Sequence, residues 1–372
     1  MAESLAQASA PATAAQPDLS VVIVTYNAAA LIGNCLDSLA TACSGLHTEV
    51  FVVDNGSADG TAELLRQHHP WVQLQATGQN LGFSAGNNRA LPLCRGRAVM
   101  LLNPDTVVQP GAVSSLLAHL QAHPDAGAVG PMLRLGDGSI QAECARRLPA
   151  PGNLLPWLLL LDKLAHKVQS RSRRRLTAQA APQPASEPPP PRWYDGFNLL
   201  AWPRQQACAV QSICGACLLM RQEVLQQVGL LDESSPMYLD DIDYCRRILN
   251  AGWAIHYQPA AVITHLWQQS SHPHRAGDHY ALGCHAVWLY LRKHHGVAAG
   301  RAFAAMAALA ALLRLPPAAL MAAWPGAKQP DRRRRLRMTQ GLARWAWRWP
   351  KRPPLFGFAS ESDVARPQVV PW

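Results

Sequence analysis

Three aspartates stand within four residues of one another in the segment MYLDDIDYCRR, residues 237–247. The apolar residues that follow have helical spacing, so Asp240, Asp241 and Asp243 are predicted to open a helix. One carboxylate at such a position is explained as a cap that the helix dipole favours. Three carboxylates repel one another unless a cation, a proton or a nearby arginine compensates. This segment is therefore the strongest local indication of a functional site.

Two further aspartates directly follow strand-like runs. Asp54 comes after Val52-Val53, and Asp105 ends the segment LLNPD that begins at Leu101. Either residue alone is explained as a turn residue, since Asp, Asn, Gly and Pro dominate turns. Ligands of open α/β sheets bind beyond the carboxyl ends of the strands. Two carboxylates on the same rim therefore favour a binding site.

Other motifs give weaker indications. His265 ends the strand-like run AVITH; a single histidine there is usually structural, but beside Asp105 it is a candidate ligand of a divalent ion. The loop NLGFSAGNN, residues 80–88, is neither a P-loop nor GxGxxG, so it fits a helix start or close packing beside a ligand. Cys214 and Cys217 form a lone CxxC in a strand-like run, which favours buried thiols over a metal or redox site.

The elements that must position these residues alternate between strand and helix patterns from residue 19 to residue 131. Strands are predicted at 21–26, 49–53, 72–76, 98–102 and 253–257, and helices near 31–39, 64–65, 83–91 and 111–123. Asn27 is expected to cap the first helix. Such alternation predicts right-handed βαβ units and an α/β fold with a Rossmann-like, mostly parallel, doubly wound sheet.

The domain organisation follows from composition. We expect a disordered tail at 1–18, a catalytic domain at 19–295 with an inserted low-complexity loop at 163–192, and a helical, basic, Trp-rich extension at 296–372. The N-terminus lacks the pattern of a secretory signal, and nine scattered cysteines indicate reduced, cytosolic thiols. The apolar run 298–324 is interrupted by Arg301, Arg314 and Pro316-Pro317, so no bilayer-spanning segment is expected.

The formal charge of +10 is concentrated near the end of the 372-residue chain. Residues 286–352 hold fourteen basic residues and one acidic residue, whereas residues 1–285 hold 19 basic and 21 acidic ones. Bulk basicity therefore does not drive the chemistry of the first 285 residues. Tryptophans interleaved with arginines, in the absence of a nucleic-acid-binding motif, favour an anionic membrane surface as the partner of the extension and not nucleic acid. The alternative is a solvated basic tail.

Taken in order, these motifs resemble a family-2 glycosyltransferase of the GT-A type, in particular its bacterial rhamnosyltransferase-like branch. The resemblance covers about residues 19–295 and rests on VVIVTYN (21–27), VVDNGSADGT (52–61), NLGF (80–83), LLNPD (101–105), GSIQ (138–141), GACLLMR (215–221), GLLDE (229–233), MYLDDID (237–243), AGW (251–253) and His265.

The resemblance implies roles on the donor side. Asp54 would accept a hydrogen bond from N3–H of the uracil or thymine of a nucleotide-sugar, and Asp59 would support that loop. Asp105 and His265 would bind the Mg²⁺ or Mn²⁺ that bridges the donor diphosphate. The remaining donor-side positions that it implies are Thr25, Asn27, Asn80, Gly82 and Asn103.

On the acceptor side, Asp241 matches the general base that deprotonates the acceptor hydroxyl. Asp240, Asp243 and Arg246 would lie near it. Asp240 stands where the family usually has Glu. The insertion at 163–192 falls near the expected acceptor side, so the resemblance does not define the acceptor there. The implied activity is transfer, with inversion, of a sugar, rhamnose favoured, from a dTDP- or UDP-sugar. The expected acceptor is a lipid-linked saccharide, and the expected process is cell-surface polysaccharide synthesis. The enzyme is expected to be cytoplasmic and peripheral to the inner face of the plasma membrane.

Two alternatives belong to other classes. A nucleotidyltransferase of similar fold would carry a basic, Gly-rich phosphate loop near the first strand, and the segment TYNAA that begins at Thr25 has neither feature. A non-catalytic membrane-surface or saccharide-binding module would need no general base. The series of carboxylate motifs therefore favours the enzyme.

Overall fold

The computed structural model describes residues 16–161, 205–234, 238–266, 276–326 and 328–348. The first half consists of β1 (Leu19–Thr25), α1 (Ile32–Ala42), β2 (Thr48–Asp54), α2 (Thr61–His68), β3 (Gln73–Ala76), α3 (Gly82–Ala90), the short η1 (Leu91–Leu93), β4 (Ala98–Leu102), β5 (Thr106–Val108), α4 (Ala112–Ala122), β6 (Ala126–Arg134), η2 (Ala142–Cys144), β7 (Ala145–Arg146) and α5 (Pro151–Leu158). The second half consists of β8 (Cys208–Val210), β9 (Ser212–Ile213), β10 (Cys217–Arg221), α7 (Gln222–Val228), α8 (Asp240–Asn250), β11 (Ala254–His265), α9 (Ala276–Ala323) and α10 (Gln329–Arg348).

The large sheet confirms the predicted α/β class. Its order is β3-β2-β1-β4-β10-β6-β11-β5, with β8 also paired to β11. The β3-β2-β1-β4 half is wholly parallel, as are β6 and β11, whereas β10 is antiparallel to both of its neighbours. The strands at residues 253–257 and 261–265 are one strand, β11, with register irregularities between Ala254 and Ile255 and between Gln258 and Val262.

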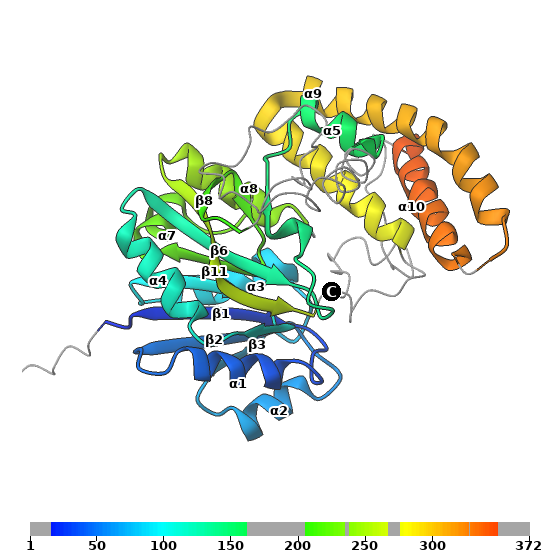
Figure 1. Ribbon diagram of the computed structural model, residues 1–372. Helices are drawn as coiled ribbons and strands as arrows, with labels where there is room; N and C mark the ends of the chain where they lie inside the picture. Colours follow the sequence, from blue (N-terminus) through cyan, green and yellow to red (C-terminus); the bar gives the residue numbers. More distant parts are fainter. Residues whose placement is uncertain (1–15, 162–204, 235–237, 267–275, 327, 349–372) are drawn as a thin grey trace, which may run out of the picture.

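Helices cover both faces of the sheet, which makes three layers (Figure 1). Alternate residues of β1 face opposite layers. Val21 and Ile23 pack with α1 and α4, while Val22 and Val24 pack with α3, α7 and α8. This explains why the first strand is a continuous apolar run: both of its faces are buried.

The predicted cap at Asn27 is wrong. Helix α1 begins at Ile32, and its N-cap position, Leu31, makes no side-chain capping bond. Asn27 instead adopts a left-handed conformation with φ of 50°, and its Oδ1 accepts a hydrogen bond from the Ala58 N–H at 2.8 Å. Asparagine tolerates this conformation better than most residues, so the side chain crosses to the loop after β2.

A separate helical layer of α5, α9 and α10 lies beside the sheet (Figure 1). It has a hydrophobic core of its own that includes Leu154, Trp288, Phe303, Leu342 and Trp345. The backbone of α9 leaves helical geometry at Gly296, where φ is 85° and ψ is 172°.

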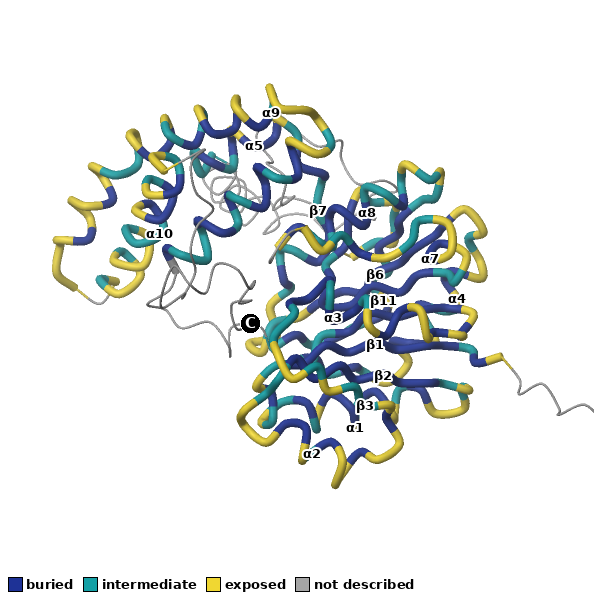
Figure 2. The backbone as a smooth tube through the Cα atoms, turned by 180° about the vertical axis from the view of Figure 1, so that it is seen from behind, coloured by how far each residue is buried: buried dark blue, intermediate teal, exposed yellow. Residues whose placement is uncertain are grey.

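The sequence-based expectation about the apolar run at 298–324 needs correction. Pro316 and Pro317 do not interrupt α9, which continues to Ala323. By length and composition, the stretch Gly277–Ala323 is able to cross a membrane, with a third of its most apolar window buried against the rest of the protein. The exposed side of this helix is visible as a series of yellow segments in Figure 2.

Parts of the predicted organisation lie outside the described residues. These are residues 1–15 of the N-terminal tail, the inserted loop at 163–192 and residues 349–372 of the extension. Residues 16–18 are described, and Asp18 forms an ion pair with Arg97.

A substitution at Gly86 tests how closely α3 approaches the sheet. A Cβ there would lie 2.7 Å from Cγ1 of Val24 and 3.2 Å from Nδ2 of Asn55. We therefore expect Gly86→Ala to lower the free energy of unfolding by about 1–3 kcal/mol through overpacking. In the control, Gly33→Ala, the new Cβ meets only Nε2 of His69, at 3.7 Å, so helix propensity should leave stability equal or higher. Urea denaturation of both variants measures the difference, and equal stabilities would contradict the close contact.

Candidate active site

One edge of the sheet gathers the candidate residues. Thr25 and Asp54 are paired at the carboxyl ends of β1 and β2, and Asn103 directly follows β4. Because β10 runs antiparallel to β4, its first residue lies opposite Leu102, and Ala216 accepts a hydrogen bond from the Asn103 N–H. Strands of both directions therefore deliver side chains to the same edge.

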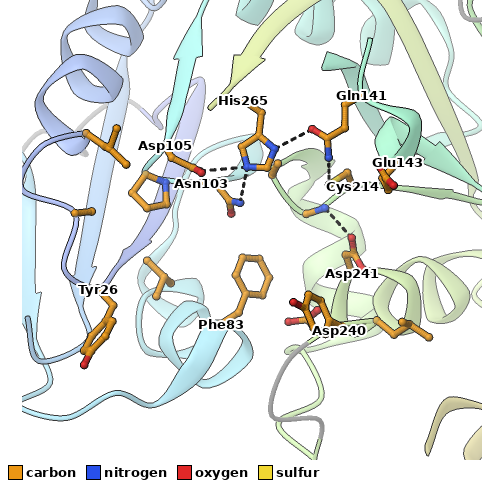
Figure 3. A pocket seen from close by; sticks show the side chains of 18 of the residues that line it. Tyr26, Phe83, Asn103, Asp105, Gln141, Glu143, Cys214, Asp240, Asp241 and His265 are labelled. Atoms are coloured by element: carbon orange, nitrogen blue, oxygen red, sulfur yellow. Dashed lines mark hydrogen bonds and ion pairs between the residues drawn. The ribbon is translucent and has the colours of Figure 1, made fainter. Parts of the chain in front are cut away.

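The last residue of β11, His265, pairs with Thr106, the first residue of β5. The Leu266 N–H also donates to the Asp105 carbonyl oxygen at 2.8 Å. As a result, Nε2 of His265 lies 3.2 Å from Oδ1 of Asp105 (Figure 3). The structure thus brings together the two residues that the sequence proposed as metal ligands.

The hydrogen bonds of His265 define what this pair can bind. Oε1 of Gln141 lies 2.9 Å from Nδ1 of His265, so that nitrogen carries the proton and donates it. Nδ2 of Asn103 lies 3.3 Å from Nε2, in agreement with a lone pair on that nitrogen. Nε2 and a carboxylate oxygen of Asp105 therefore face each other, an arrangement that positive charge between them, from a proton or a metal ion, stabilises.

A divalent ion fits this donor set. Asp105 offers a hard carboxylate oxygen, and the imidazole of His265 is oriented by an acceptor behind it, as in many metal sites. Both side chains are largely buried. Two protein ligands leave the other coordination positions to diphosphate oxygens and water, as Mg²⁺ and Mn²⁺ accept.

Asp241 lies across the same pocket (Figure 3). Its Oδ2 accepts a hydrogen bond from the Gly215 N–H at 2.9 Å, and its Oδ1 accepts one from the Ile242 N–H at 2.8 Å. A Cβ on Gly215 would come within 3.2 Å of the Asp241 Cβ, so glycine makes room for this carboxylate. The guanidinium of Arg146 lies 3.9 Å from Oδ2. The carboxylate is thus oriented by the protein and has one cation nearby.

Asp240 differs from Asp241 in its electrostatics. Burial, followed by the neighbouring charge of Asp241, raises the pKa of Asp240 well above its ordinary value. The two residues before it, Tyr238 and Leu239, both have positive φ, of 67° and 59°. Such backbone strain in residues other than glycine persists only where the surroundings impose it. It turns the start of α8 toward the pocket.

The loop after β2 holds the two aspartates predicted to serve the donor side. Asp54 is 3% exposed and accepts hydrogen bonds from the hydroxyl and the N–H of Ser57. Asp59 accepts from the Ala29 N–H at 3.0 Å and from the hydroxyl and N–H of Thr61. Burial opposes the charge of Asp59, but these hydrogen bonds outweigh it and lower its pKa. Asp59 therefore fastens the loop after β2 to the segment after β1.

Two predicted donor-side residues carry buried polar atoms without a hydrogen-bond partner among the described residues. They are Oγ1 of Thr25 and Nδ2 of Asn80. The other amide atom of Asn80 accepts from the Gly82 N–H, at the start of α3. Unsatisfied buried groups in a native protein call for a ligand or water, so both atoms are suited to contact a bound molecule.

Two predicted acceptor-side residues do not line the pocket. Asp243 lies on the opposite side of α8, where its Oδ1 is 2.8 Å from Nζ of Lys293 and 2.7 Å from Nε2 of His294. It also pairs with Arg247 one turn later. Arg246 is likewise absent from the pocket lining. Asp243 thus joins α8 to α9.

Several residues of the pocket were not identified from the sequence. Gln141, Arg146, Cys214, Phe83 and Tyr238 all line it. Gln141 ends the motif GSIQ, which resembled the family without suggesting a role, while nothing in the spacing of Arg146 indicated a partner for Asp241. Of the two cysteines of the lone CxxC, Cys217 is buried, as the sequence predicted, and Cys214 is half-buried.

Two family models match the chain in succession. One, described as glycosyl transferase family 2, matches residues 20–178, and the other, glycosyltransferase like family 2, matches residues 194–277. Together they span the sheet and every pocket residue except His279.

Curated relatives and solved structures agree with these models. The chain is 30% identical over 293 residues to an N-acetylglucosaminyl-diphospho-decaprenol L-rhamnosyltransferase from Mycobacterium tuberculosis, which covers 74% of this chain and 85% of the relative. A low-salt glycan biosynthesis hexosyltransferase from Haloferax volcanii is 26% identical over 65% of this chain and 68% of its own length. A mannosyltransferase from Pyrobaculum calidifontis, solved with GDP-Man and Mn²⁺, has the same fold, with a TM-score of 0.50 at 19% identity over 91% of this chain and 88% of that chain.

The raised pKa of Asp240 predicts a pH dependence of stability. Between the ordinary pKa of a carboxyl and the raised value, the folded protein holds a proton that the unfolded chain releases, so stability falls as pH rises. Asp240→Asn removes this dependence. Its Tm should therefore fall less than that of the wild type between about pH 5 and about pH 8.

Asp331→Asn is the matched control, since Asp331 is exposed in the first turn of α10. That variant should follow the wild-type profile in differential scanning calorimetry. Parallel Tm profiles for Asp240→Asn and the wild type would contradict the raised pKa.

Proposed function

Because the chain belongs to the family-2 glycosyltransferases, we propose that it moves a sugar, rhamnose in the first place, from a dTDP- or UDP-sugar to a lipid-linked saccharide in cell-surface polysaccharide synthesis. The observation that carries the proposal is one pocket lined on one side by Asp105 and His265 and on the other by Asp241. The M. tuberculosis relative, by its name an L-rhamnosyltransferase acting on a lipid diphosphate, supports the choice of sugar and acceptor.

On the donor side, Asp105 and His265 would hold Mg²⁺ or Mn²⁺. When bound, such an ion neutralises the charge that grows on the departing nucleoside diphosphate. Gln141 keeps the proton of His265 on Nδ1, so that Nε2 stays a ligand. Thr25, Asn27, Asp54, Asn80, Gly82 and Asn103 are proposed to line the nucleotide-sugar site, with Asp59 as the support of its loop.

On the acceptor side, Asp241 acts as the general base. Its carboxylate takes the proton of the acceptor hydroxyl while the hydroxyl oxygen forms a bond to the anomeric carbon. The bond from that carbon to the diphosphate oxygen breaks, and its electron pair leaves with the nucleoside diphosphate. Attack from the face opposite the leaving group inverts the anomeric configuration. The hydrogen bonds from Gly215 and Ile242 hold the carboxylate in place for this transfer.

Transfer assays with a panel of dTDP- and UDP-sugars and a synthetic lipid diphosphate that carries N-acetylglucosamine test the proposal. Asp241→Asn should lower kcat by about 10²–10⁴ and leave donor affinity nearly unchanged, because it removes only the base. Asp105→Asn should instead weaken Mn²⁺-dependent donor binding. Nuclear magnetic resonance of the product should show an anomeric configuration opposite to that of the donor.

Asp37→Asn, on the exposed side of α1, is the control and should retain wild-type kcat. Wild-type transfer by Asp241→Asn would refute the assignment of the base. A product with the donor's configuration would refute inversion, and full activity after chelation of divalent ions would refute the metal.

We further propose that the helical extension docks on the cytoplasmic face of the plasma membrane as a peripheral surface. The C-terminal half of α9, with the residue that follows it, has an apolar ridge of exposed residues, namely Leu309, Leu312, Leu313, Leu320, Met321 and Trp324. Their spacing follows one face of a helix. Leu312 and Leu320 are 71% and 72% exposed. Water-exposed leucines in a continuous row favour a lipid surface or another apolar partner.

Cations adjoin this apolar ridge and support the choice of anionic lipid. Arg333, Arg334 and Arg335 are exposed at the start of α10, and Arg332 donates a hydrogen bond to the carbonyl of Trp324 at 3.2 Å. The hydrogen bond of Arg332 thus places the start of α10 beside the tryptophan that ends the ridge. An apolar stripe edged by tryptophan and arginine is typical of helices that lie in the membrane interface.

Sedimentation with phosphatidylcholine vesicles, with and without phosphatidylglycerol, tests this docking. Leu312→Glu with Leu320→Glu should abolish binding to both vesicle types. Replacing Arg333, Arg334 and Arg335 by Gln should weaken binding to anionic vesicles roughly a hundredfold, at about 1 kcal/mol per arginine.

Leu93→Glu is the control, since Leu93 is 48% exposed on the sheet domain. It should bind vesicles like the wild type. Transfer to a short, water-soluble acceptor should be the same in all variants. Unchanged sedimentation of the double leucine variant would refute the docking surface.

A further inference from the structure

Three histidines meet at the end of the sheet opposite the pocket. His119 and His123 are four residues apart at the end of α4, and His256 lies near the beginning of β11. Each offers a ring nitrogen within 4.8 Å of those of the other two. The strand β11 runs away from this cluster and reaches the pocket only at His265, and none of the three histidines lines the pocket. The cluster is therefore separate from the glycosyltransferase site.

The three rings are close enough to share one ion. Nε2 of His119 lies 2.9 Å from Nδ1 of His256. Two nitrogens bound to one tetrahedral zinc ion lie roughly 3.3 Å apart, given Zn–N bonds of about 2.0–2.1 Å. His119 and His256 are buried, and His123 is half-buried at the surface end of the group. Between His119 and His256 a shift of a few tenths of an ångström would admit an ion, and the ring of His123, within 4.8 Å of both, would move to complete the site.

For His123 and His256, contacts on the outer ring nitrogen direct the lone pair of the other nitrogen inward. Nδ1 of His123 donates to the carbonyl oxygen of His119 at 2.9 Å, which leaves Nε2 of His123 as the ligand atom. Nε2 of His256 lies 3.8 Å from Oδ2 of Asp125, which favours the proton on Nε2 and leaves Nδ1 free. Metal-bound histidines commonly have such a carbonyl or carboxylate behind the ligating ring.

The cluster is also short of protons. Burial, and then the proximity of His123 and His256, lowers the pKa of His119 to about 4, although Asp125 opposes this effect. The pKa of His256 is lowered by burial as well, with Asp125 again opposing. Neutral imidazole is the form that binds metals, so His119 and His256 need no deprotonation near neutral pH.

We propose that His119, His123 and His256 bind a divalent first-row transition metal ion, with Zn²⁺ as the best match, and that this ion fastens α4 to β11. Three imidazoles with one open position for water suit zinc, whereas Mg²⁺ and Ca²⁺ prefer oxygen ligands. The proton that His119 now shares with His256 must move to Nδ1 of His119. Gln258, whose Nε2 lies 3.1 Å from that nitrogen, would turn its amide so that the oxygen accepts this proton.

Metal titration of the full chain tests the inference. The titration uses the Asp105→Asn variant, in which binding of an ion at Asp105 and His265 is weakened. After treatment with a chelator, this protein should bind one equivalent of Zn²⁺, and Co²⁺ should give the intense visible bands of tetrahedral coordination. His123→Ala should weaken Zn²⁺ binding at least tenfold and remove the Co²⁺ bands. Gln258→Glu should tighten binding, because a carboxylate accepts the Nδ1 proton better.

His68→Ala is the matched control, since His68 is exposed on α2 and outside the cluster. It should bind Zn²⁺ like the parent protein, and Zn²⁺ should raise the Tm of the parent and of His68→Ala but not of His123→Ala. Equal Zn²⁺ affinity in His123→Ala and its parent, or no tetrahedral Co²⁺ spectrum in the parent, would overturn the proposal. Because donor turnover is not measured, these outcomes do not depend on the proposed glycosyl transfer.

Discussion

The pairing of His265 with Thr106 is the interaction on which the site depends. It joins β11 to the short strand β5 that follows Asp105, and so presses an imidazole nitrogen against a carboxylate. Gln141 accepts the Nδ1 proton on the far side, so Nε2 is the ring nitrogen that faces the carboxylate. The backbone bond between Leu266 and Asp105 prevents the strands from relaxing apart. The fold thereby builds a place where positive charge is stabilised.

A continuous series of contacts runs from this place to Asp241, the proposed base. Gln141 contacts both His265 and the thiol of Cys214, and the next residue, Gly215, donates its N–H to Asp241. This series exists because β10 is inserted antiparallel beside β4, so the segment before it returns to the carboxyl edge of the parallel strands. The Asp105–His265 pair and Asp241 therefore share one frame of contacts, which is the kind of rigidity that the proposed transfer between two reactants would need.

The same helix that presents Asp241 also connects the sheet to the helical layer. Asp243 points away from the pocket and pairs with Lys293 and His294 of α9. Asp232 pairs with Lys293 as well, so one lysine serves two carboxylates. Part of the positive charge near the end of the chain, namely Lys293, therefore neutralises carboxylates at and near the start of α8 and is not available to a partner.

The sequence by itself determined the α/β class and the approximate positions of β1 to β4 and α1 to α4. These follow from local periodicity, whereas the grouping of Asp105, His265 and Asp241 in one site followed from motifs at strand ends and from the family resemblance. Tertiary structure decided what depends on contacts distant in sequence: Asn27 bonds to the loop after β2, Asp243 turns to α9, and Arg146 approaches Asp241. The type of each of these side chains is compatible with other contacts as well as with the observed one. Which neighbour a polar side chain meets is decided only when strands of opposite direction and distant helices pack together.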